Sequence, residues 1–485
     1  MCRLRSSRPL SPASSACRKL AVVLPAAVPA KVPESLVFRV LVGCVLPRLS
    51  YVCRVCHPSV VVSRAAPAIR AIEGVAQSCF GWSDAEFSSC LPQVSSPARD
   101  GGFGLVPLEV LAPASWLDGC LAAAVSLGWA ETLDDSARFW SSAPTKLAGE
   151  VRAVFKNLRD SAPAFFPSSL EGLDVGSLSS AFRRAGGGAR WQAQFIEWLS
   201  SGARESFARG LEKRERETYE RRLEESGGAV LEMLPPFGFS LSTETWRTAA
   251  RLRSGLPVAP AFCTVSESRC ALFTRDGKRC NKQLDDKGHH ALCCSCGGGF
   301  TVRHDHIREV LASALRRFGC VVHTERWTHE LYDEQKKKHA RMDLVVYVGG
   351  RCFYLDVTCV HPFSERGVPR ADGKVVQAQL EKHKRYRTVV AGVRVTQATL
   401  VPIALSSFGK VGPEASDFFS LVARCYVGRE NLESEWTDPA GYLAALCSYL
   451  AVMHSAQTRI HAHTSPDHGP HRRPRPKVAA APSSG

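Results

Sequence analysis

RMDLVVYVGGRCFYLDVTCVHP, residues 341–362, is the stretch that decides the fold. Its β-branched and aromatic residues predict two strands, and Gly349 and Gly350 predict a tight turn between them. Each strand has one acid within an apolar run, Asp343 in the first and Asp356 in the second. Because side chains alternate between the two faces of a strand, two acids of one hairpin are able to converge on one point.

Such a pair of carboxylates suits a divalent cation, because Mg2+ binds carboxylate oxygens and keeps several of its waters. The alternative is that one acid caps a turn and the other is solvated. The apolar strands favour a site, since a buried carboxylate without a partner is unfavourable.

The segments around the hairpin predict an α/β core with a mixed sheet. We expect, in order, a helix over 304–318, a strand over 320–328, a basic loop over 333–339, the hairpin, a helix over 374–387 and a strand over 399–406. On the second helix Ala378, Lys382 and Tyr386 recur every four residues, so Lys382 is able to face the sheet while Lys384 points elsewhere. A lysine beside two aspartates would stabilise charge that develops on a phosphate. The alternative for these lysines is a solvated basic face.

A cysteine-rich segment, CALFTRDGKRCNKQLDDKGHHALCCSCGGG, occupies residues 270–299. Four of its residues are candidate zinc ligands: Cys270, Cys280, His290 and Cys294. The first two flank a turn-forming Arg-Asp-Gly, and one helical turn is able to present the other two. A tetrahedral structural zinc needs four such ligands and stabilises a loop too small to have its own core. The alternative is a set of free thiols beside a glycine turn, and spare ligands are available at Cys263, His289, Cys293 and Cys296.

Length and composition limit the class of protein. A chain of 485 residues is long enough for two to four domains, and its 45% hydrophobic content excludes wholesale disorder. The net charge of +16 favours a polyanionic partner, because a positive field attracts phosphates. Nineteen scattered cysteines favour a reducing compartment, with some of them holding metal.

The two ends of the chain have unusual compositions. Residues 1–33 resemble a signal or transit peptide, but their apolar run is short and is broken by Pro25 and Pro29. No later stretch reaches the length of a membrane span without a charge or a proline, so we expect no membrane partner. Residues 461–477 are rich in Pro, His and Arg, which predicts a disordered tail with a basic patch.

The first half of the chain is expected to be mainly helical. Apolar residues at helical spacing predict helices from residue 34 onward, with a kink or break at Pro47. After Ser96 we expect a glycine-rich turn, a short strand-like piece and a helix that begins after Pro113. Residues 203–225 interleave Glu and Arg, which predicts a solvated helical spacer.

A series of motifs in the C-terminal half resembles a known family. It consists of Cys280…His290-Ala-Leu-x-Cys294, a Gly-Gly-Gly followed by Arg303-His304, Arg341-Met-Asp343, Leu355-Asp-Val-Thr-x-x-x-Pro362 and Glu381-Lys-x-x-x-Tyr386. This order is similar to the C-terminal half of non-long-terminal-repeat retrotransposon proteins that carry a zinc knuckle and a restriction-like endonuclease of the PD-(D/E)xK type. The match covers residues 252–425. Residues 34–200 are similar to the segment that follows the polymerase palm in such proteins.

The resemblance implies a nuclear, Mg2+-dependent endonuclease that nicks target DNA so that reverse transcription is primed there. Asp343 and Asp356 would bind the ion, and Glu309 would supply an extra acid. Thr358 stands where a catalytic lysine is usual, and Met342 where a proline often precedes the first aspartate. Lys382 would therefore supply the positive charge from the helix. The knuckle would bind DNA or element RNA beside a basic surface made of Arg303, His304, Lys336, Lys337, Lys338, Arg341 and Lys384.

The expected organisation has six parts: an uncertain segment (1–33), a helical region (34–200), a charged helical linker (201–250), the knuckle (251–300), the nuclease (301–425), and a helix with a basic tail (426–485). The chain has no Tyr/Phe-Ala-Asp-Asp polymerase motif. We therefore expect a truncated copy that does not synthesise DNA by itself. The alternative function is that of a nucleic-acid-binding remnant or co-opted zinc-knuckle module without turnover.

Overall fold

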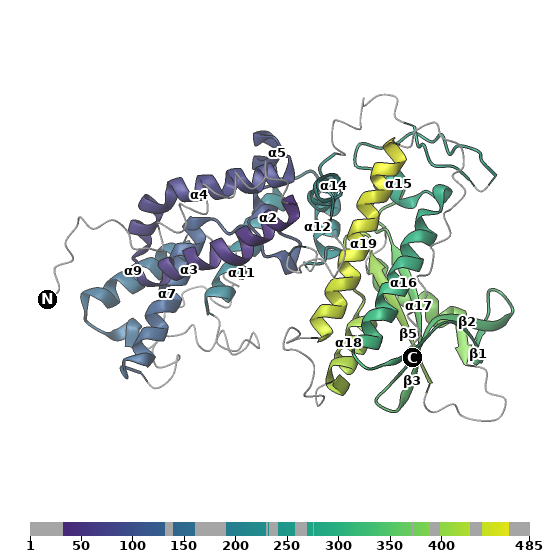
Figure 1. Ribbon diagram of the computed structural model, residues 1–485. Coiled ribbons are helices and arrows are strands. Elements are labelled where there is room, and N and C mark those ends of the chain that lie inside the picture. Colours follow the sequence, from purple (N-terminus) through teal and green to yellow (C-terminus); the bar gives the residue numbers. More distant parts are fainter. Residues whose placement is uncertain are drawn as a thin grey trace, which may run out of the picture.

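The computed structural model describes residues 33–130, 139–160, 191–228, 231, 241–257, 269–274, 276–370, 373–388, 398–426 and 439–464. Within these limits the molecule has a helical lobe, residues 33–209, and an α/β lobe, residues 269–464 (Figure 1). The expected mainly helical first half and mixed sheet are therefore present. The leader-like segment 1–33 lies outside the described residues except for Pro33.

The longer helices of the helical lobe are α2 (Glu34–Val40), α3 (Leu46–Val55), α4 (Pro58–Phe80), α7 (Leu108–Ser126), α9 (Lys146–Asp160) and α11 (Trp191–Arg209). A π-helical turn, Leu41–Val45, separates α2 from α3 just before Pro47. Proline has no N–H and its ring crowds the preceding turn, and the wider turn accommodates it, so the helical path continues through Pro47 without the break that was one of the two predicted outcomes.

One detail of this lobe differs from the prediction. Helix α7 begins at Leu108 and contains Pro113, whereas we expected the helix to start after that proline. No strand occurs between residues 101 and 107, all of which the structure describes. Pro113 lies in the second turn of α7, where the loss of one backbone hydrogen bond is tolerated because Trp116 and Leu117 are buried.

The segment 203–225 is helical as predicted, but it is not solvated along its whole length. The segment forms the end of α11, a break at Gly210, and α12 (Lys213–Glu224). Tyr219, Arg222 and Glu225 are buried. Interleaved charges are typical of an exposed helix, but an arginine is able to bury its aliphatic stem when its head finds a polar partner. Arg222 does so, since its Nη2 donates to Gln93 Oε1 at 3.3 Å.

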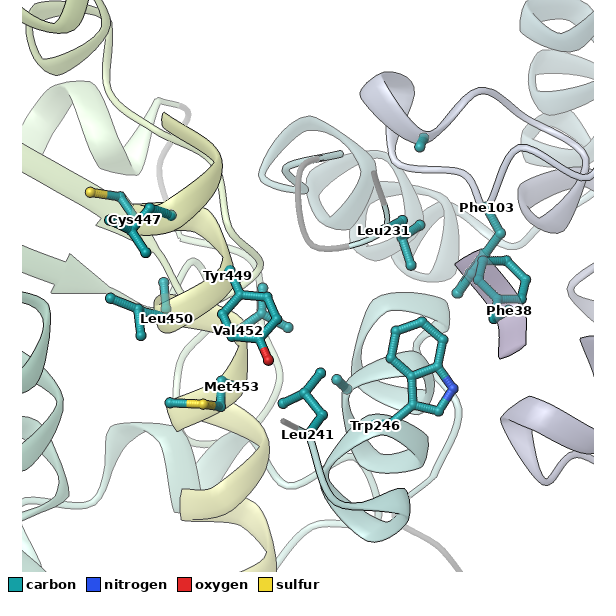
Figure 2. Close-up of a cluster of buried hydrophobic side chains, with 14 of the residues drawn as sticks. Phe38, Phe103, Leu231, Leu241, Trp246, Cys447, Tyr449, Leu450, Val452 and Met453 are labelled. Carbon is teal, nitrogen blue, oxygen red and sulfur yellow. The ribbon is translucent and has the colours of Figure 1, made fainter. Parts of the chain in front are cut away.

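The two lobes share one hydrophobic core instead of being joined by a linker. Helix α14 (Thr243–Ser254) lies between them, and its Trp246 points toward Phe38 of α2, while Val452 of α19 (Pro439–Thr464) belongs to the same cluster (Figure 2). The indole Nε1 of Trp246 donates to the carbonyl oxygen of Cys79 at 3.1 Å. Part of the expected charged helical linker, residues 201–250, therefore lies in this core.

The sheet has five strands in the order β4-β1-β2-β3-β5. Their bounds are β1 Val321–Asp333, β2 Lys338–Val348, β3 Arg351–Val360, β4 Tyr386–Thr388 and β5 Ala398–Ser406. Strands β3 and β5 are parallel and the other neighbours are antiparallel, so the sheet is mixed as predicted. Gly349 and Gly350 both have positive φ in the β2–β3 turn, which explains why glycine occupies both positions.

Two elements end elsewhere than predicted. Strand β1 continues to Asp333, five residues beyond the expected end, because it pairs there with β4. Helix α17 (Lys374–Arg385) ends two residues early, because Tyr386 and Arg387 form part of that edge strand.

Helices cover both faces of the sheet. On one face α16 (Gly299–Arg317) packs on the hairpin strands β2 and β3, and α18 (Pro413–Tyr426) and α19 pack on β5. The apolar side chains of this face, among them Leu344 and Leu355, belong to the main core. On the other face α17 packs on β5 through Val375, Ala378 and Ala404. The face of Tyr354 carries a smaller cluster with Met342 and Tyr386. This arrangement brings α17 and the start of α16 to the two sides of the acid pair.

The C-terminal helix α19 extends further than the composition suggests. Residues 461–464, expected to be disordered, are its last turn, and Ala462 is buried against the cysteine cluster. The backbone N–H of Ala271 donates to Ala462 O at 3.1 Å, which ties the cluster to this helix. The remainder of the expected tail, from residue 465, lies outside the described residues.

Two stretches, Glu34–Val55 and Leu108–Ser126, are long and apolar enough to cross a membrane by length and composition alone. About half of each is buried within the protein, as it would be in a core helix. The expectation that the protein has no membrane partner stays a prediction.

Candidate metal centre and active site

Three cysteines and one histidine form a compact cluster in the α/β lobe. The ligand atoms of Cys270, Cys280, His290 and Cys294 all lie within 4.8 Å of one another. Two extended segments that pair around the Gly277 turn carry the first two. His290 lies in the short helix α15 (His289–Cys293), and Cys294 directly follows it. The four residues predicted as ligands are therefore brought together and are able to hold a metal such as zinc.

The separations within the cluster fit a tetrahedral zinc. Bond lengths of about 2.3 Å to sulfur and about 2.0–2.1 Å to nitrogen place two sulfurs about 3.8 Å apart, and a sulfur about 3.5 Å from a nitrogen. Cys294 Sγ lies 3.9 Å from Cys270 Sγ and 3.6 Å from Cys280 Sγ. Cys280 Sγ lies 3.5 Å from His290 Nε2. Three thiolates and one imidazole are also the donor set that structural zinc prefers.

A carboxylate missed by the sequence reasoning supports the histidine. Glu365 Oε2 lies 3.5 Å from His290 Nδ1 and 3.0 Å from Lys282 Nζ. Partners of this kind fix the tautomer and the ring orientation of a metal-binding histidine. Glu365 is 75 residues from His290, so no local spacing reveals it.

The spare ligands have other roles. His289 Nδ1 lies 3.0 Å from His361 Nε2, and Cys293 Sγ donates to Phe363 O at 3.4 Å. Cys296 lies beside Cys294 but outside the four-residue cluster. Cys263 lies outside the described residues.

The two strand acids lie at the end of the β2–β3 pairing. Leu344 is opposite Leu355, and Val345 is opposite Tyr354. One residue further, where the two strands cease to pair, the same register puts Asp343 level with Asp356. Both side chains line one cleft of about 450 Å3, to which Lys382 of α17 and His304 of α16 also contribute.

Each acid has a cationic or hydrogen-bonding partner. Lys382 Nζ lies 2.7 Å from Asp356 Oδ1, and the exposed fractions of these side chains are 18% and 7%. His304 Nε2 lies 2.9 Å from Asp343 Oδ2, which also accepts a hydrogen bond of 2.7 Å from the Val357 N–H. The acids are thus fixed in position from three elements, β3, α16 and α17.

The environment moves the two carboxyl pKa values apart. Burial raises the pKa of Asp356 above its ordinary value, opposed by the charge of Lys382 and reinforced by that of Asp343. Burial acts in the same direction on Asp343, but the hydrogen bond and charge of His304, with the Val357 N–H and Lys382, hold its pKa below the usual range. The hydrogen bond to Asp343 in turn raises the pKa of His304. The charge of Asp343 therefore acts on the ionisation of Asp356, as expected for two carboxyl groups that line one cleft.

The basic residues predicted to bind nucleic acid are divided between two locations. The cleft is lined by four of them, Arg303, His304, Lys336 and Arg341. Outside the cleft, Lys337 pairs with Glu334 at 3.1 Å, and Lys338 Nζ lies 5.2 Å from the centroid of the Trp327 ring. Lys384 is exposed on α17 and does not line the cleft. Arg303 itself is buried and donates to Cys359 O at 3.3 Å.

The expected role of Glu309 as an extra acid is not supported. Its side chain is 55% exposed, is paired with Arg308 at 2.8 Å and does not line the cleft. Helix α16 starts five residues before the expected start, and its first turns, with Phe300 and His304, face the acids. Glu309 lies five residues beyond His304, about 7.5 Å along the axis and about 140° around it.

Two further residues of the cleft were not assigned a role from the sequence. Tyr386, recognised only as sharing a face with Lys382, is a second partner of the Asp356 carboxylate. Arg385 lines the cleft and pairs with Asp333 at 2.6 Å, which connects the end of α17 to β1.

Neither a scan against protein-family models nor a search of curated proteins returned a match to this chain. The chemistry of both sites therefore follows from their own residues and geometry.

Proposed function

We propose that the protein is a metal-dependent DNA endonuclease of the kind carried by non-long-terminal-repeat retrotransposon proteins, and that it nicks target DNA. One observation carries the proposal: Asp343, Asp356 and Lys382 line the same cleft, and the lysine reaches one acid at 2.7 Å. The order α16, β1–β2–β3, α17, β5 around a mixed sheet is consistent with a restriction-like nuclease core.

Asp343 and Asp356 would hold the Mg2+ ion. Their carboxylates are hard oxygen ligands, and their mutual repulsion in a largely buried site is relieved by a divalent cation. When bound, such an ion activates a water and neutralises charge on the scissile phosphate. His304 and the Val357 N–H would keep Asp343 oriented, since both bond the same carboxylate oxygen.

Lys382 would stabilise charge on the phosphate from the helix, in place of a lysine at the strand position of Thr358. Its Nζ lies at the surface of the cleft, and the ammonium is balanced by Asp356. A cation positioned in advance stabilises developing negative charge more effectively than solvent does.

DNA would approach over basic side chains next to the cleft. Lys336 and Arg341 line it, and the exposed Lys337 and Lys338 continue the positive surface along the β1–β2 turn. The zinc-binding cluster, as a knuckle, would add a second contact to DNA or to element RNA. A nuclear location would follow from a chromosomal target.

One observation favours the second candidate, a nucleic-acid-binding remnant without turnover. Both acids are already bonded to cationic or ionisable side chains, Lys382 and His304, which is also a stable arrangement without a metal. Thr358, where a lysine is usual, points the same way.

Nicking of supercoiled plasmid in Mg2+ distinguishes the two candidates. We expect the wild type to nick, and Asp356→Asn and Asp343→Asn to be slower by about a hundredfold or more, because each removes a charged metal ligand. Asp417→Asn, an exposed acid of α18, is the matched control and keeps wild-type activity. Equal nicking by the wild type and Asp356→Asn, or no nicking by any of them, rules out the endonuclease function. The nucleic-acid-binding remnant is then the candidate that stays.

A further inference from the structure

A second cleft, of about 570 Å3, lies where α12 meets the end of α14 and the segment before α15. It shares no lining residue with the cleft at the acid pair. Tyr219 and Arg222 of α12 line it and are only 5% and 8% exposed. No residue of this cleft takes part in the proposed nuclease site. A ligand bound in this cleft would therefore not depend on the nuclease function.

Arg222 is a buried cation without an anionic partner among the described residues. Its Nη2 donates to Gln93 Oε1 at 3.3 Å, while its Nε has no acceptor within the described part of the chain. The guanidinium lies 5.4 Å from the centroid of the Tyr219 ring, and the hydroxyl of Tyr219 has no hydrogen-bond partner among the residues that the structure describes. Burial lowers the pKa of Arg222 to about 10, so the group is still charged at neutral pH. A buried charge of this kind is unfavourable unless a counter-charge is supplied.

The backbone is shaped around this guanidinium. A Cβ at Gly255 would lie 1.8 Å from Arg222 Nη1, and Gly255 has a φ of +69°, which other residues rarely adopt. The positive φ favours glycine at the end of α14, and the missing side chain leaves the space that the arginine head occupies. The main chain at Gly255 therefore lies directly beside the arginine head at the cleft.

The rim of the cleft is mixed in charge. Arg214, Lys287 and Arg366 are its other basic side chains, and its acids are Glu215, Asp285 and Asp286. Asp285 is already engaged, because its two oxygens accept hydrogen bonds of 2.8 and 2.7 Å from the N–H groups of His289 and His290. With Asp285 engaged, the basic side chains that line the cleft outnumber its remaining acids, and Arg222 is the buried one among them.

We propose that this cleft binds a phosphate group, belonging either to a free nucleotide or to a single nucleic-acid strand, through Arg222 and Tyr219. The planar guanidinium matches two phosphate oxygens, and the tyrosine hydroxyl is a further donor. The volume of the cleft is within the range of sites that take a small ligand.

The test uses the full chain with its zinc, and four versions of it: the wild type, Arg222→Met, Tyr219→Phe, and the control Arg209→Met. The control removes an arginine that is 58% exposed on the neighbouring helix α11. Thermal unfolding is followed in inorganic phosphate, in a nucleoside 5′-monophosphate, and in chloride of equal ionic strength. Because phosphate also stabilises proteins in general, the comparison between variants carries the result.

We expect phosphate or nucleotide at millimolar concentration to raise the melting temperature of the wild type and the control by about 2 °C or more over chloride. Arg222→Met should lose this shift and Tyr219→Phe should keep only part of it. A labelled single-stranded oligonucleotide should bind about tenfold more weakly to Arg222→Met than to the control if the phosphate belongs to a strand, whereas a nucleotide-only effect assigns a free nucleotide. Equal shifts in the wild type and Arg222→Met overturn the proposal. So does a wild type that responds to neither phosphate nor nucleotide, and that result requires no variant to fold.

Discussion

Replacement of Lys382 by methionine tests how the acid pair is balanced. Methionine keeps the length and the apolar packing of the side chain but removes the ammonium that lies 2.7 Å from Asp356 Oδ1. Asp356 then remains 7% exposed and level with Asp343, without a cation of its own. We therefore expect a loss of stability that is far larger than for an ordinary surface lysine.

The distance sets the size of the loss. At 2.7 Å and an effective dielectric constant of about 20, the attraction between two unit charges is about 6 kcal/mol. In the variant Asp356 is able to take up a proton, and the neutral carboxyl group is less unfavourable in this site than an unpaired carboxylate. From an ordinary pKa of 3.8, protonation at pH 7.5 requires about 5 kcal/mol, and this is the upper limit. We expect Lys382→Met to lower the free energy of unfolding by about 3–5 kcal/mol at pH 7.5, as for other broken buried pairs, and by about 2 kcal/mol at pH 5.5.

The assay is urea unfolding in magnesium-free buffer and in about 10 mM Mg2+, at both pH values. Lys384→Met is the matched control, since Lys384 is exposed two residues further along α17 and should change stability by less than about 0.5 kcal/mol. Mg2+ should stabilise Lys382→Met more than the wild type, because the ion supplies the missing positive charge. Equal stability of the two lysine variants without Mg2+ refutes the electrostatic reasoning. A Mg2+ effect that is the same in the wild type and in Lys382→Met refutes the shared ion.

Three further results are expected. Metal analysis should find about one zinc per chain. Cys294→Ser should lose this zinc and melt several degrees lower, because binding of the metal is coupled to folding. A full zinc content in the variant contradicts the ligand assignment. Burial lowers the pKa of His454 to about 4, so this histidine destabilises the fold as pH falls below 6.5. Between pH 7 and pH 5 the wild type should lose about 2 kcal/mol more than His454→Gln in urea unfolding, and parallel pH profiles would exclude this. Glu309→Gln should nick plasmid at the wild-type rate, since Glu309 bonds Arg308 outside the cleft. A large loss of nicking rate in this variant would show that Glu309 belongs to the active site after all.

Local sequence patterns predicted the hairpin and its surroundings well. The strands on either side of Gly349 and Gly350, the flanking helices and the strand that follows them all follow from periodicity and turn chemistry, which act over a few residues. The burial of α12 and α14 did not follow. Arg253, for example, donates to Ala98 O and Gly102 O, more than 150 residues earlier, and a run of charges gives no sign of such partners.

The candidate sites divide in the same way. Four-residue spacing on a helix was enough to indicate that Lys382 faces the sheet, and ligand chemistry was enough to select Cys270, Cys280, His290 and Cys294. The partner of Asp343 was missed, because His304 lies 39 residues away on another element. Glu309 was misplaced because the helix begins at Gly299, and this changes which of its turns meets the strands.

Binding of Mn2+, followed by electron paramagnetic resonance, tests the pair of carboxylates most directly, because Mn2+ takes the same oxygen ligands as Mg2+. Purified with Zn2+ in the buffer, the wild type should bind about one Mn2+ that Mg2+ displaces, and an Asp343→Asn/Asp356→Asn double variant should bind none at that site. Equal Mn2+ binding by the wild type and the double variant would contradict the account.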